Sequence, residues 1–237
     1  MEARVEKGLL ERLELEPIEG IEAKAERHMA LCYSQMARFT PGKYLDAALG
    51  MTESAYRGTI FPEGDHTLEA LDAKAERIPK LYPTKDGFKT VTHSFVSGPS
   101  AALHRGTDIV YYYERERPKG ITGAVRFGLK AASIVLPEYE YATAAHGGAV
   151  EAVLDDLTGT VVRHCQSVWM ATSEFTAKLK KPCPIDKTMT FEGWVDSVEK
   201  RGLYCIAKAK ILCGGVVIAT AEAKMVDTVV LAQLMKR

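Results

Sequence analysis

The sequence predicts an α+β fold in which a curved antiparallel β-sheet wraps around one long central helix, with a helical N-terminal extension. Three patterns support this fold class. Apolar residues recur every three or four positions over residues 146–163, apolar and polar residues alternate over much of residues 174–226, and good helix formers fill residues 1–49. Strands that are apolar on one face must bury that face against another element. The long helix is the element that we expect to pack there.

The extension is predicted to span residues 1–86 and to be mainly helical. Ile21 to Phe39 is rich in Ala, Glu, Lys and Met, which favour helices. Leu68 to Leu81 is predicted as a further helix that ends near two prolines. The extension contains no recognisable catalytic motif, so we expect either a cap on the second domain, residues 87–237, or a docking surface for another subunit.

After residue 87 the hydrophobic period shifts towards two. Strands are predicted at residues 89–96, 108–113 and 121–129, where β-branched and aromatic residues are frequent. The long helix follows, and its apolar stripe comprises Ala149, Val150, Val153, Leu154, Leu157 and Val161. Later strands alternate cleanly, and Gly214-Gly215 predicts the turn of a hairpin.

Composition excludes several classes of protein. The 237 residues are 46% hydrophobic and 26% charged, and no run approaches the ~18 apolar residues of a membrane span. Lys plus Arg equals Asp plus Glu at 31 each, so no overall charge indicates binding to nucleic acid. The five cysteines lack the spacing of a zinc site or a disulfide framework, and we expect reduced thiols and no metal.

Chemistry is expected at the start of the long helix. Gly147 and Gly148 open it, so its first N–H groups can approach a ligand oxygen closely, at the positive end of the helix dipole. The string His146-Gly147-Gly148, with Asp155 nine positions after the histidine, resembles the hotdog-fold acyl-CoA thioesterases of the phenylacetate-pathway and thioesterase-superfamily types. Further motifs extend the resemblance over roughly residues 107–227: Tyr111-Tyr112-Tyr113, Pro118-Lys119-Gly120 and Lys180-Lys181-Pro182-Cys183-Pro184-Ile185.

The resemblance implies a hotdog fold for residues 87–237 and hydrolysis of an acyl-CoA to a carboxylate and coenzyme A without a cofactor. In this family the N–H of the residue matching Gly147 polarises the thioester carbonyl, and Asp155 matches the nucleophile or general base. Asp155 lies ~13 Å along the helix from its start, so the resemblance implies a dimer in which Asp155 of one protomer faces Gly147 of the other. Asp156 points about 100° away and is the less favoured base.

The resemblance also implies supporting roles for other residues. Thr172 matches a hydroxyl that binds the attacking water or the catalytic carboxylate, and His146 matches a residue that orders the loop. Contacts to the coenzyme A phosphates are implied for Lys178, Lys180, Lys181 and Arg201. The net charge of +5 over residues 178–237, from eleven basic and six acidic residues, suits a phosphate-bearing ligand or, equally, solvated strand faces.

Two positions depart from the family pattern. Glu140 stands where several relatives have Asn, and Glu151 stands four residues before Asp155, where close relatives tend to have a small residue. With the N-terminal extension, these departures motivate an alternative: a catalytically inactive hotdog protein that serves as a structural subunit of a larger complex. A dehydratase on the same fold is a third and weaker hypothesis.

The expected partners are an acyl-CoA substrate and further copies of the chain, as a homodimer or a dimer of dimers. A role in fatty acid metabolism follows from the same resemblance. No secretory hydrophobic segment follows Met1, and the cysteines read as reduced. We therefore expect an intracellular protein of the cytoplasm or the mitochondrial matrix.

Overall fold

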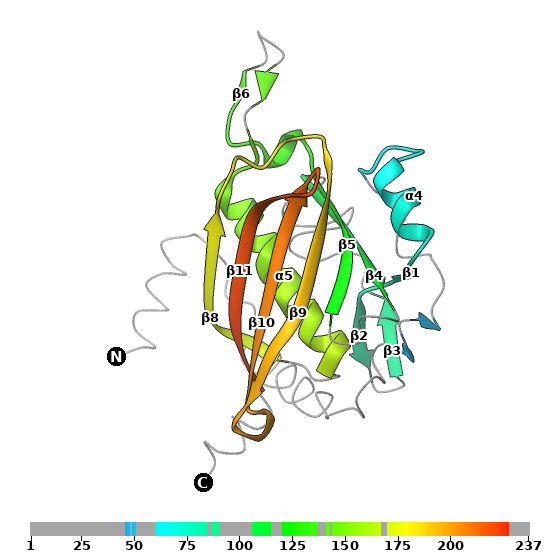
Figure 1. Cartoon of the computed structure of the whole chain (residues 1–237), viewed down its shortest axis with the longest axis vertical. Helices are drawn as coiled ribbons and strands as arrows, with labels where there is room; N and C mark the ends of the chain where they lie inside the picture. The colour runs from blue at the N-terminus through cyan, green and yellow to red at the C-terminus, as the bar shows by residue number, and fades with distance from the viewer. Residues whose placement is uncertain are drawn as a thin grey trace, which may run out of the picture. The chain divides into compact units, whose positions relative to one another are not determined.

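The structure is a computed structural model (Figure 1). It describes residues 46–47, 49–50, 60–84, 87–90, 106–114, 120–136, 141–142, 144–166 and 170–227. The chain divides into two compact units, Met1–Gln35 and Met36–Arg237, and every described residue lies in the second. Most of the helical segments expected in residues 1–49 therefore lie outside the described residues.

A seven-stranded antiparallel sheet dominates the second unit, in the order β1-β4-β5-β9-β10-β11-β8. Its strands are β1 (Glu76–Ile78), β4 (Thr107–Tyr113), β5 (Gly120–Phe127), β8 (Met170–Leu179), β9 (Thr188–Glu199), β10 (Tyr204–Cys213) and β11 (Val216–Asp227). Two small sheets pair β2 (Leu81–Thr84) with β3 (Gly87–Thr90), and β6 (Val135–Leu136) with β7 (Tyr141–Ala142). The 3-10 helices η2 (Leu129–Ala131) and η4 (Lys200–Gly202) lie in connections.

The central helix α5 (Gly147–Gln166) packs against the concave face of this sheet, and it is seen behind the strands in Figure 1. All six residues of the predicted apolar stripe are at most 5% exposed. They join Tyr111, Val125, Phe191 and Ile211 from the strands in one hydrophobic core. The predicted architecture, a curved antiparallel sheet around one long helix, is confirmed.

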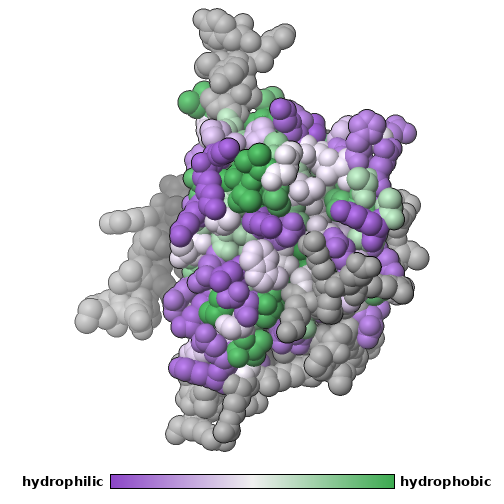
Figure 2. Space-filling model, in the orientation of Figure 1, coloured by the Kyte–Doolittle hydropathy of each residue, from purple (hydrophilic) through white to green (hydrophobic). Residues whose placement is uncertain are grey.

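Charged side chains occupy the opposite face of β8 to β11. Ion pairs link neighbouring strands, with Lys208 to Asp196 at 2.8 Å, Lys210 to Glu192 at 3.1 Å and Lys224 to Glu174 at 3.0 Å. In Figure 2 hydrophilic side chains cover much of this face, between hydrophobic patches near its two ends. The alternation predicted for these strands thus places one face on α5 and the other in solvent.

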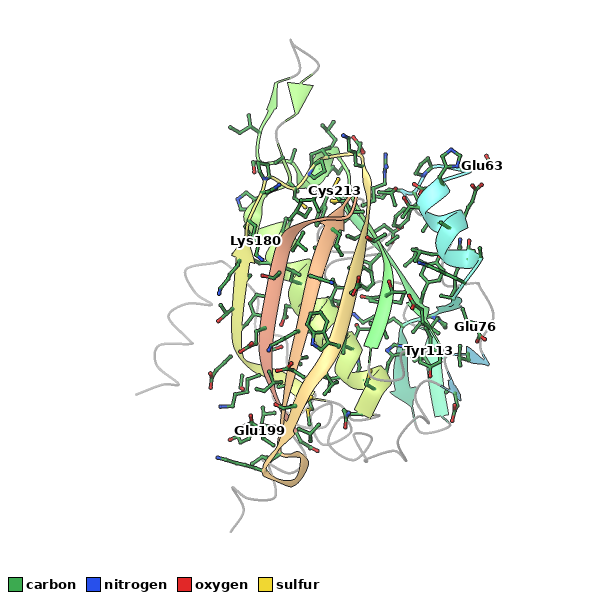
Figure 3. All side chains as sticks on the ribbon, in the orientation of Figure 1. Glu63, Glu76, Tyr113, Lys180, Glu199 and Cys213 are labelled. Carbon is green, nitrogen blue, oxygen red and sulfur yellow. The ribbon has the colours of Figure 1, made fainter. Side chains whose placement is uncertain are left out.

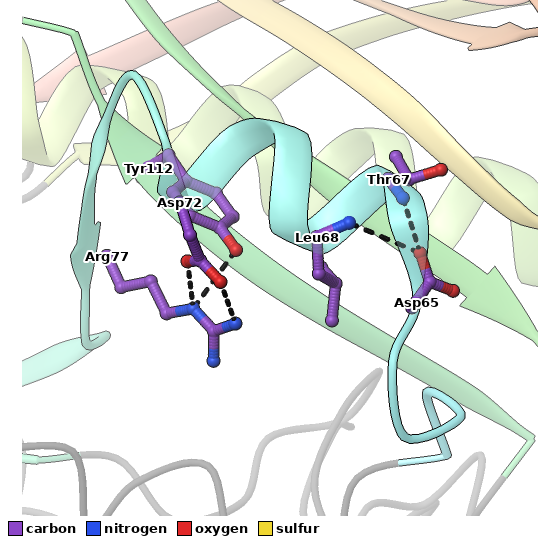
Figure 4. Close-up of polar contacts among 6 residues, drawn as sticks. All are labelled: Asp65, Thr67, Leu68, Asp72, Arg77 and Tyr112. Carbon is purple, nitrogen blue, oxygen red and sulfur yellow. Dashed lines mark hydrogen bonds and ion pairs between the residues drawn. The ribbon is translucent and has the colours of Figure 1, made fainter.

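A short helix, α4 (His66–Asp72), covers the outer face of β4 and β5. Leu68 and Leu71 pack there with Val110, Tyr112 and Ala124. The carboxylate of Asp65 caps the helix by accepting hydrogen bonds from the N–H groups of Thr67 and Leu68, at 2.9 and 3.2 Å (Figure 4).

The prediction of one helix over residues 68–81 is wrong. The helix ends at Asp72, and β1 and β2 follow. The residues after Asp72 favour helices, but β1 gains a ladder with β4 and completely buries Ile78. Arg77 of β1 also donates to Asp72 and to the Tyr112 hydroxyl, at 2.6 and 3.0 Å (Figure 4). Tertiary contacts override local propensity here, and part of the expected extension belongs to the sheet.

Candidate active site

The loop that leads into α5 is held by backbone hydrogen bonds on both sides. The N–H of His146 donates to the carbonyl of Ala131 at 2.7 Å, and the N–H of Ala145 donates to the carbonyl of Cys183 at 2.8 Å. These bonds tie the start of the helix to η2 and to the segment after β8. The position of Gly147 is therefore fixed by two other parts of the chain.

His146 caps the helix. Its carbonyl accepts from the N–H groups of Ala149 and Val150, and its ring Nδ1 accepts from the N–H of Gly148 at 3.1 Å. Among the described residues, none accepts a hydrogen bond from the N–H of Gly147. That group is left as the donor for a ligand oxygen at the positive end of a 20-residue helix.

The hydroxyl of Thr172 donates to Oδ1 of Asp155 at 2.8 Å. This contact depends on an irregularity in β8. Lys224 of β11 pairs with Glu174, whereas Met225 pairs with Thr172, so the register shifts by one residue between them. Such a β-bulge changes the face on which the next side chain lies, and it places Thr172 on the side of α5.

Asp156 has a different environment, as the helical spacing predicts. It forms an ion pair with Lys80 and accepts a hydrogen bond from the Tyr111 hydroxyl at 2.5 Å. Burial alone would raise the pKa of Asp156, but the charges of Lys80 and Arg163 and the hydrogen bonds hold it below its usual range. Burial and the Asp156 charge raise the pKa of Tyr111, so its hydroxyl stays protonated and donates. The Asp156 carboxylate therefore makes contacts that hold the fold together, to Lys80 and to Tyr111.

A cavity of about 280 Å³ adjoins the start of α5. Gly147 and Val150 of the helix line it together with Lys180 and Lys181 from the segment after β8. Cys183 also lines it, but burial, with Cys213 nearby, raises the pKa of this thiol to about 12. The thiol is protonated at neutral pH and is a poor nucleophile.

The other predicted coenzyme A contacts lie elsewhere in the chain. Lys178 is exposed on β8, pairs with Thr220 of β11 and is not among the residues that line this cavity. The backbone of Arg201 lies in η4. Figure 3 shows Glu199, beside η4, at the opposite end of the sheet from Lys180. Within one chain, the structure thus joins Gly147 with Lys180 and Lys181, and Asp155 with Thr172. Lys178 does not line the cavity, and for Arg201 the structure places the backbone alone, in η4.

Sequence reasoning did not identify Lys80, Tyr111 and Arg163 as neighbours of Asp156, or Ser173 as the residue of the bulge. Lys80, Tyr111 and the bulge depend on how separate segments pack, so no spacing signal points to them. Arg163 lies seven positions after Asp156 on the same helix, and that spacing could have identified it. Of the two departures from the family pattern, Glu151 is exposed on α5 and Glu140 lies outside the described residues.

Within the described ranges, no group of three or more His, Cys, Asp or Glu side chains is arranged to hold a metal ion. None of the helices in this part of the chain is both long and apolar enough to cross a membrane. His164 is buried, and burial lowers its pKa to about 4 although it contacts the carbonyl of Thr160 at 2.9 Å. It is therefore neutral at physiological pH.

No protein-family model matches the sequence, and no curated protein matches it. Several solved structures are similar in fold. A hypothetical thioesterase from Streptococcus pneumoniae TIGR4, solved with coenzyme A, is 20% identical, with a TM-score of 0.41 over 52% of this chain and 88% of that chain. The PaaI protein of the E. coli phenylacetic acid degradation operon is 17% identical, with a TM-score of 0.40 over 53% and 84% of the two chains.

Zebrafish thioesterase superfamily member 2 is 10% identical, with a TM-score of 0.43 over 56% of this chain and 89% of that chain. Each similarity spans about half of this chain and concerns the fold alone. The S. pneumoniae protein and the zebrafish protein both carry thioesterase names.

Proposed function

We propose that the protein is an acyl-CoA thioesterase that hydrolyses an acyl-CoA to a free carboxylate and coenzyme A, at a site between two copies of the chain. The observation that carries the proposal is the hydrogen bond from Thr172 to Asp155, made on β8, the last strand of the sheet in the described residues. The donor N–H of Gly147 stands near the other end of the same edge strand. Neither half is a complete site by itself.

We propose that two copies of the chain pair through their edge strands and thereby complete the active site. Within the part of the chain that the structure describes, β8 is an edge of the sheet, so its outer row of backbone groups can pair with β8 of a second copy. In a two-fold antiparallel pair, the residue at the centre faces its own counterpart. If that residue is Phe175 or Thr176, Thr172 lies opposite Lys178 or Lys180 of the second copy.

This register brings the two halves of the site together. In each copy Leu179 packs on Gly147, since its Cδ1 lies 3.2 Å from where a Cβ on that glycine would stand. Asp155 and Thr172 of one copy would then lie beside Gly147 of the other. On one helix Gly147 and Asp155 lie about 12 Å apart, too far to act on the same carbonyl group. In the dimer the two groups that act together come from different copies.

The arrangement suits thioester cleavage. The N–H of Gly147 would donate to the carbonyl oxygen as negative charge develops on it. With Oδ1 held by Thr172, Asp155 keeps Oδ2 to take a proton from an attacking water, or to attack the carbonyl itself. In the first route the water oxygen bonds to the carbonyl carbon, the carbon–sulfur bond breaks, and the proton held by Asp155 passes to the leaving thiolate. In the second route loss of the thiolate, which takes a proton from solvent, leaves an anhydride between Asp155 and the acyl group, and water then hydrolyses it to the free carboxylate.

Basic residues would hold the coenzyme A. Lys180 and Lys181 line the cavity at the start of α5, and their charges suit phosphate groups. Two-fold pairing would bring the end of the sheet that carries Arg201 in one copy towards the end that carries Lys180 in the other. We propose that Lys178 contributes less than these residues, because it is exposed on the strand and does not line the cavity.

The test is thiol release from a panel of acyl-CoAs of increasing chain length. Replacing Asp155 with Asn should lower kcat about 100-fold or more, the usual cost of losing a general base or a nucleophile. Asp186→Asn is the matched control, because Asp186 is exposed and its φ of 55° suits Asn. A wild-type dimer that releases no thiol from any acyl-CoA, or full activity in Asp155→Asn, rules the proposal out.

The alternative of a catalytically inactive structural subunit stays a prediction, and the same assay decides it. An inactive chain that co-purifies in a stable complex would favour it. The proposed location, in the cytoplasm or the mitochondrial matrix, and a role in fatty acid metabolism rest on the sequence alone.

A further inference from the structure

Ser173 is the residue that β8 carries in excess at its bulge. The register passes from Glu174, opposite Lys224, directly to Thr172, opposite Met225, so Ser173 has no counterpart of its own on β11. A bulge of this kind disrupts the backbone ladder locally and is held by other contacts.

The Ser173 hydroxyl provides such a contact. It donates to the backbone carbonyl of Lys224 at 2.9 Å. The next residue, Glu174, forms an ion pair with the side chain of the same lysine at 3.0 Å. The ammonium of Lys224 also lies 4.9 Å from the centre of the Tyr204 ring. Backbone and side chain of Lys224 are thus both tied to β8, immediately beside the bulge.

The consequence for Thr172 is a change of face. In a regular strand Thr172 and Glu174 would share a face, because side chains alternate with a period of two. Glu174 reaches Lys224 on the outer face, whereas Thr172 contacts Asp155 of α5 at 2.8 Å and the sulfur of Met225 at 3.5 Å. Met225 is 2% exposed, so Thr172 lies on the α5 side of the sheet, where it is itself exposed at the edge strand.

We infer that Ser173 is a positioning residue, whose hydroxyl holds the bulge that turns Thr172 towards Asp155. The inference rests on the proposed thioesterase activity for its kinetic meaning. The geometric part, that Ser173 sets the orientation of Thr172, can be measured without activity.

The kinetic test is a double-mutant cycle. Thr172→Val should lower kcat about tenfold, the cost of one hydrogen bond to a charged group, with little change in KM. Ser173→Ala should lower kcat about three- to tenfold in the wild-type background and less than about twofold in the Thr172→Val background. Ser173→Thr, which keeps the hydroxyl, should retain activity, and Ser197→Ala on β9 is the matched control.

An equal loss on adding Ser173→Ala to either background would overturn the inference, because the serine would then act independently of Thr172. A loss in Ser173→Thr as large as in Ser173→Ala would also overturn it.

The second measurement is the NMR signal of the Met225 methyl group in protein labelled at methionine methyls. The signal should move in both Thr172→Val and Ser173→Ala and stay in place in Ser197→Ala, because Thr172 contacts the Met225 sulfur. A signal that moves in Thr172→Val but not in Ser173→Ala overturns the inference. If the wild type hydrolyses no acyl-CoA, the proposed function fails, and this measurement alone decides the positioning role.

Discussion

Two adjacent carboxylates on α5 have opposite environments. Asp155 is partly exposed and accepts from Thr172 of β8, whereas Asp156 is held by Tyr111 of β4 and by Lys80. One step along a helix rotates a side chain by about 100°, which is enough to direct neighbouring residues to different strands. The side chains of Lys80 and Asp156 are each only 14% exposed, so this pair lies where a lost partner is costly.

Asp156→Asn should destabilise the fold by about 3 kcal/mol at pH 7, because it leaves the charge of Lys80 buried without its carboxylate. The pKa of Asp156 in the folded chain lies below its ordinary value of 3.8. The carboxylate therefore contributes stability above that pH, and the contribution is lost as the pH falls through the folded-state pKa.

Urea denaturation of the wild type and the variant, from pH 7 down to pH 3, measures this. The difference in unfolding free energy between the wild type and Asp156→Asn should be about 3 kcal/mol at pH 7 and should become smaller below about pH 4. A difference that is absent at pH 7 would contradict the prediction. Asp196→Asn on the exposed face of β9 is the control, and its effect should stay below about 1 kcal/mol.

At the scale of elements, close packing of the sheet, on α5 and between its own strands, depends on glycines. A Cβ on Gly193 of β9 would stand 2.4 Å from Cγ2 of Val161 on α5. A Cβ on Gly123 of β5 would stand 2.1 Å from the carbonyl oxygen of Val110. At both positions glycine lets another part of the core approach more closely than any side chain would allow.

Gly193→Ala should therefore cost about 1–3 kcal/mol of stability, because the added methyl overpacks the contact between β9 and α5. Removing the opposing methyl groups should relieve the clash. Gly193→Ala is expected to cost less in a Val161→Ala background than in the wild type, as measured by urea denaturation. Equal costs in the two backgrounds would show that the strain lies elsewhere.

At the scale of the whole molecule, the proposed function depends on a second copy. The edge strand β8 is ten residues long and bears exposed side chains along most of its length. The opposite edge, β1, has only three residues. Long free edges are prone to pair with another strand, so β8 is the edge that favours association.

Thr176→Cys tests the register of this association. Whether the two-fold axis passes Phe175 or Thr176, the two cysteines would lie about 5–8 Å apart, and a short thiol cross-linker should join the copies. Thr220→Cys on β11 is the control. Thr220 pairs with Lys178, so the extra strand on each side and the offset along the strands would separate those cysteines by about 20 Å or more. The protein without the added cysteine is treated in the same way, which measures the background of cross-links through the native cysteines. A Thr176→Cys protein that stays monomeric on denaturing gels would contradict edge pairing through β8.

The sequence by itself determined the main architecture and the start of the site. The stripe from Ala149 to Val161 requires cover, the alternation after Glu174 supplies one-sided strands, and Gly214-Gly215 makes a turn with φ angles of 55° and 79°. These features are local, since each depends on residues a few positions apart. The resemblance of the string from His146 to Asp155 then named candidate residues whose roles stay predictions.

Only the tertiary structure decided which segments meet those residues. The helix ends at Asp72, before Ala73 to Ala75, because the residues that follow form β1 and pair with β4. This path of the chain places Lys80 beside Asp156. Strict alternation would place Thr172 on the outer face with Glu174, and the bulge at Ser173 turns it to Asp155 instead. Register and burial depend on contacts between distant parts of the chain, and a local pattern holds no information about them.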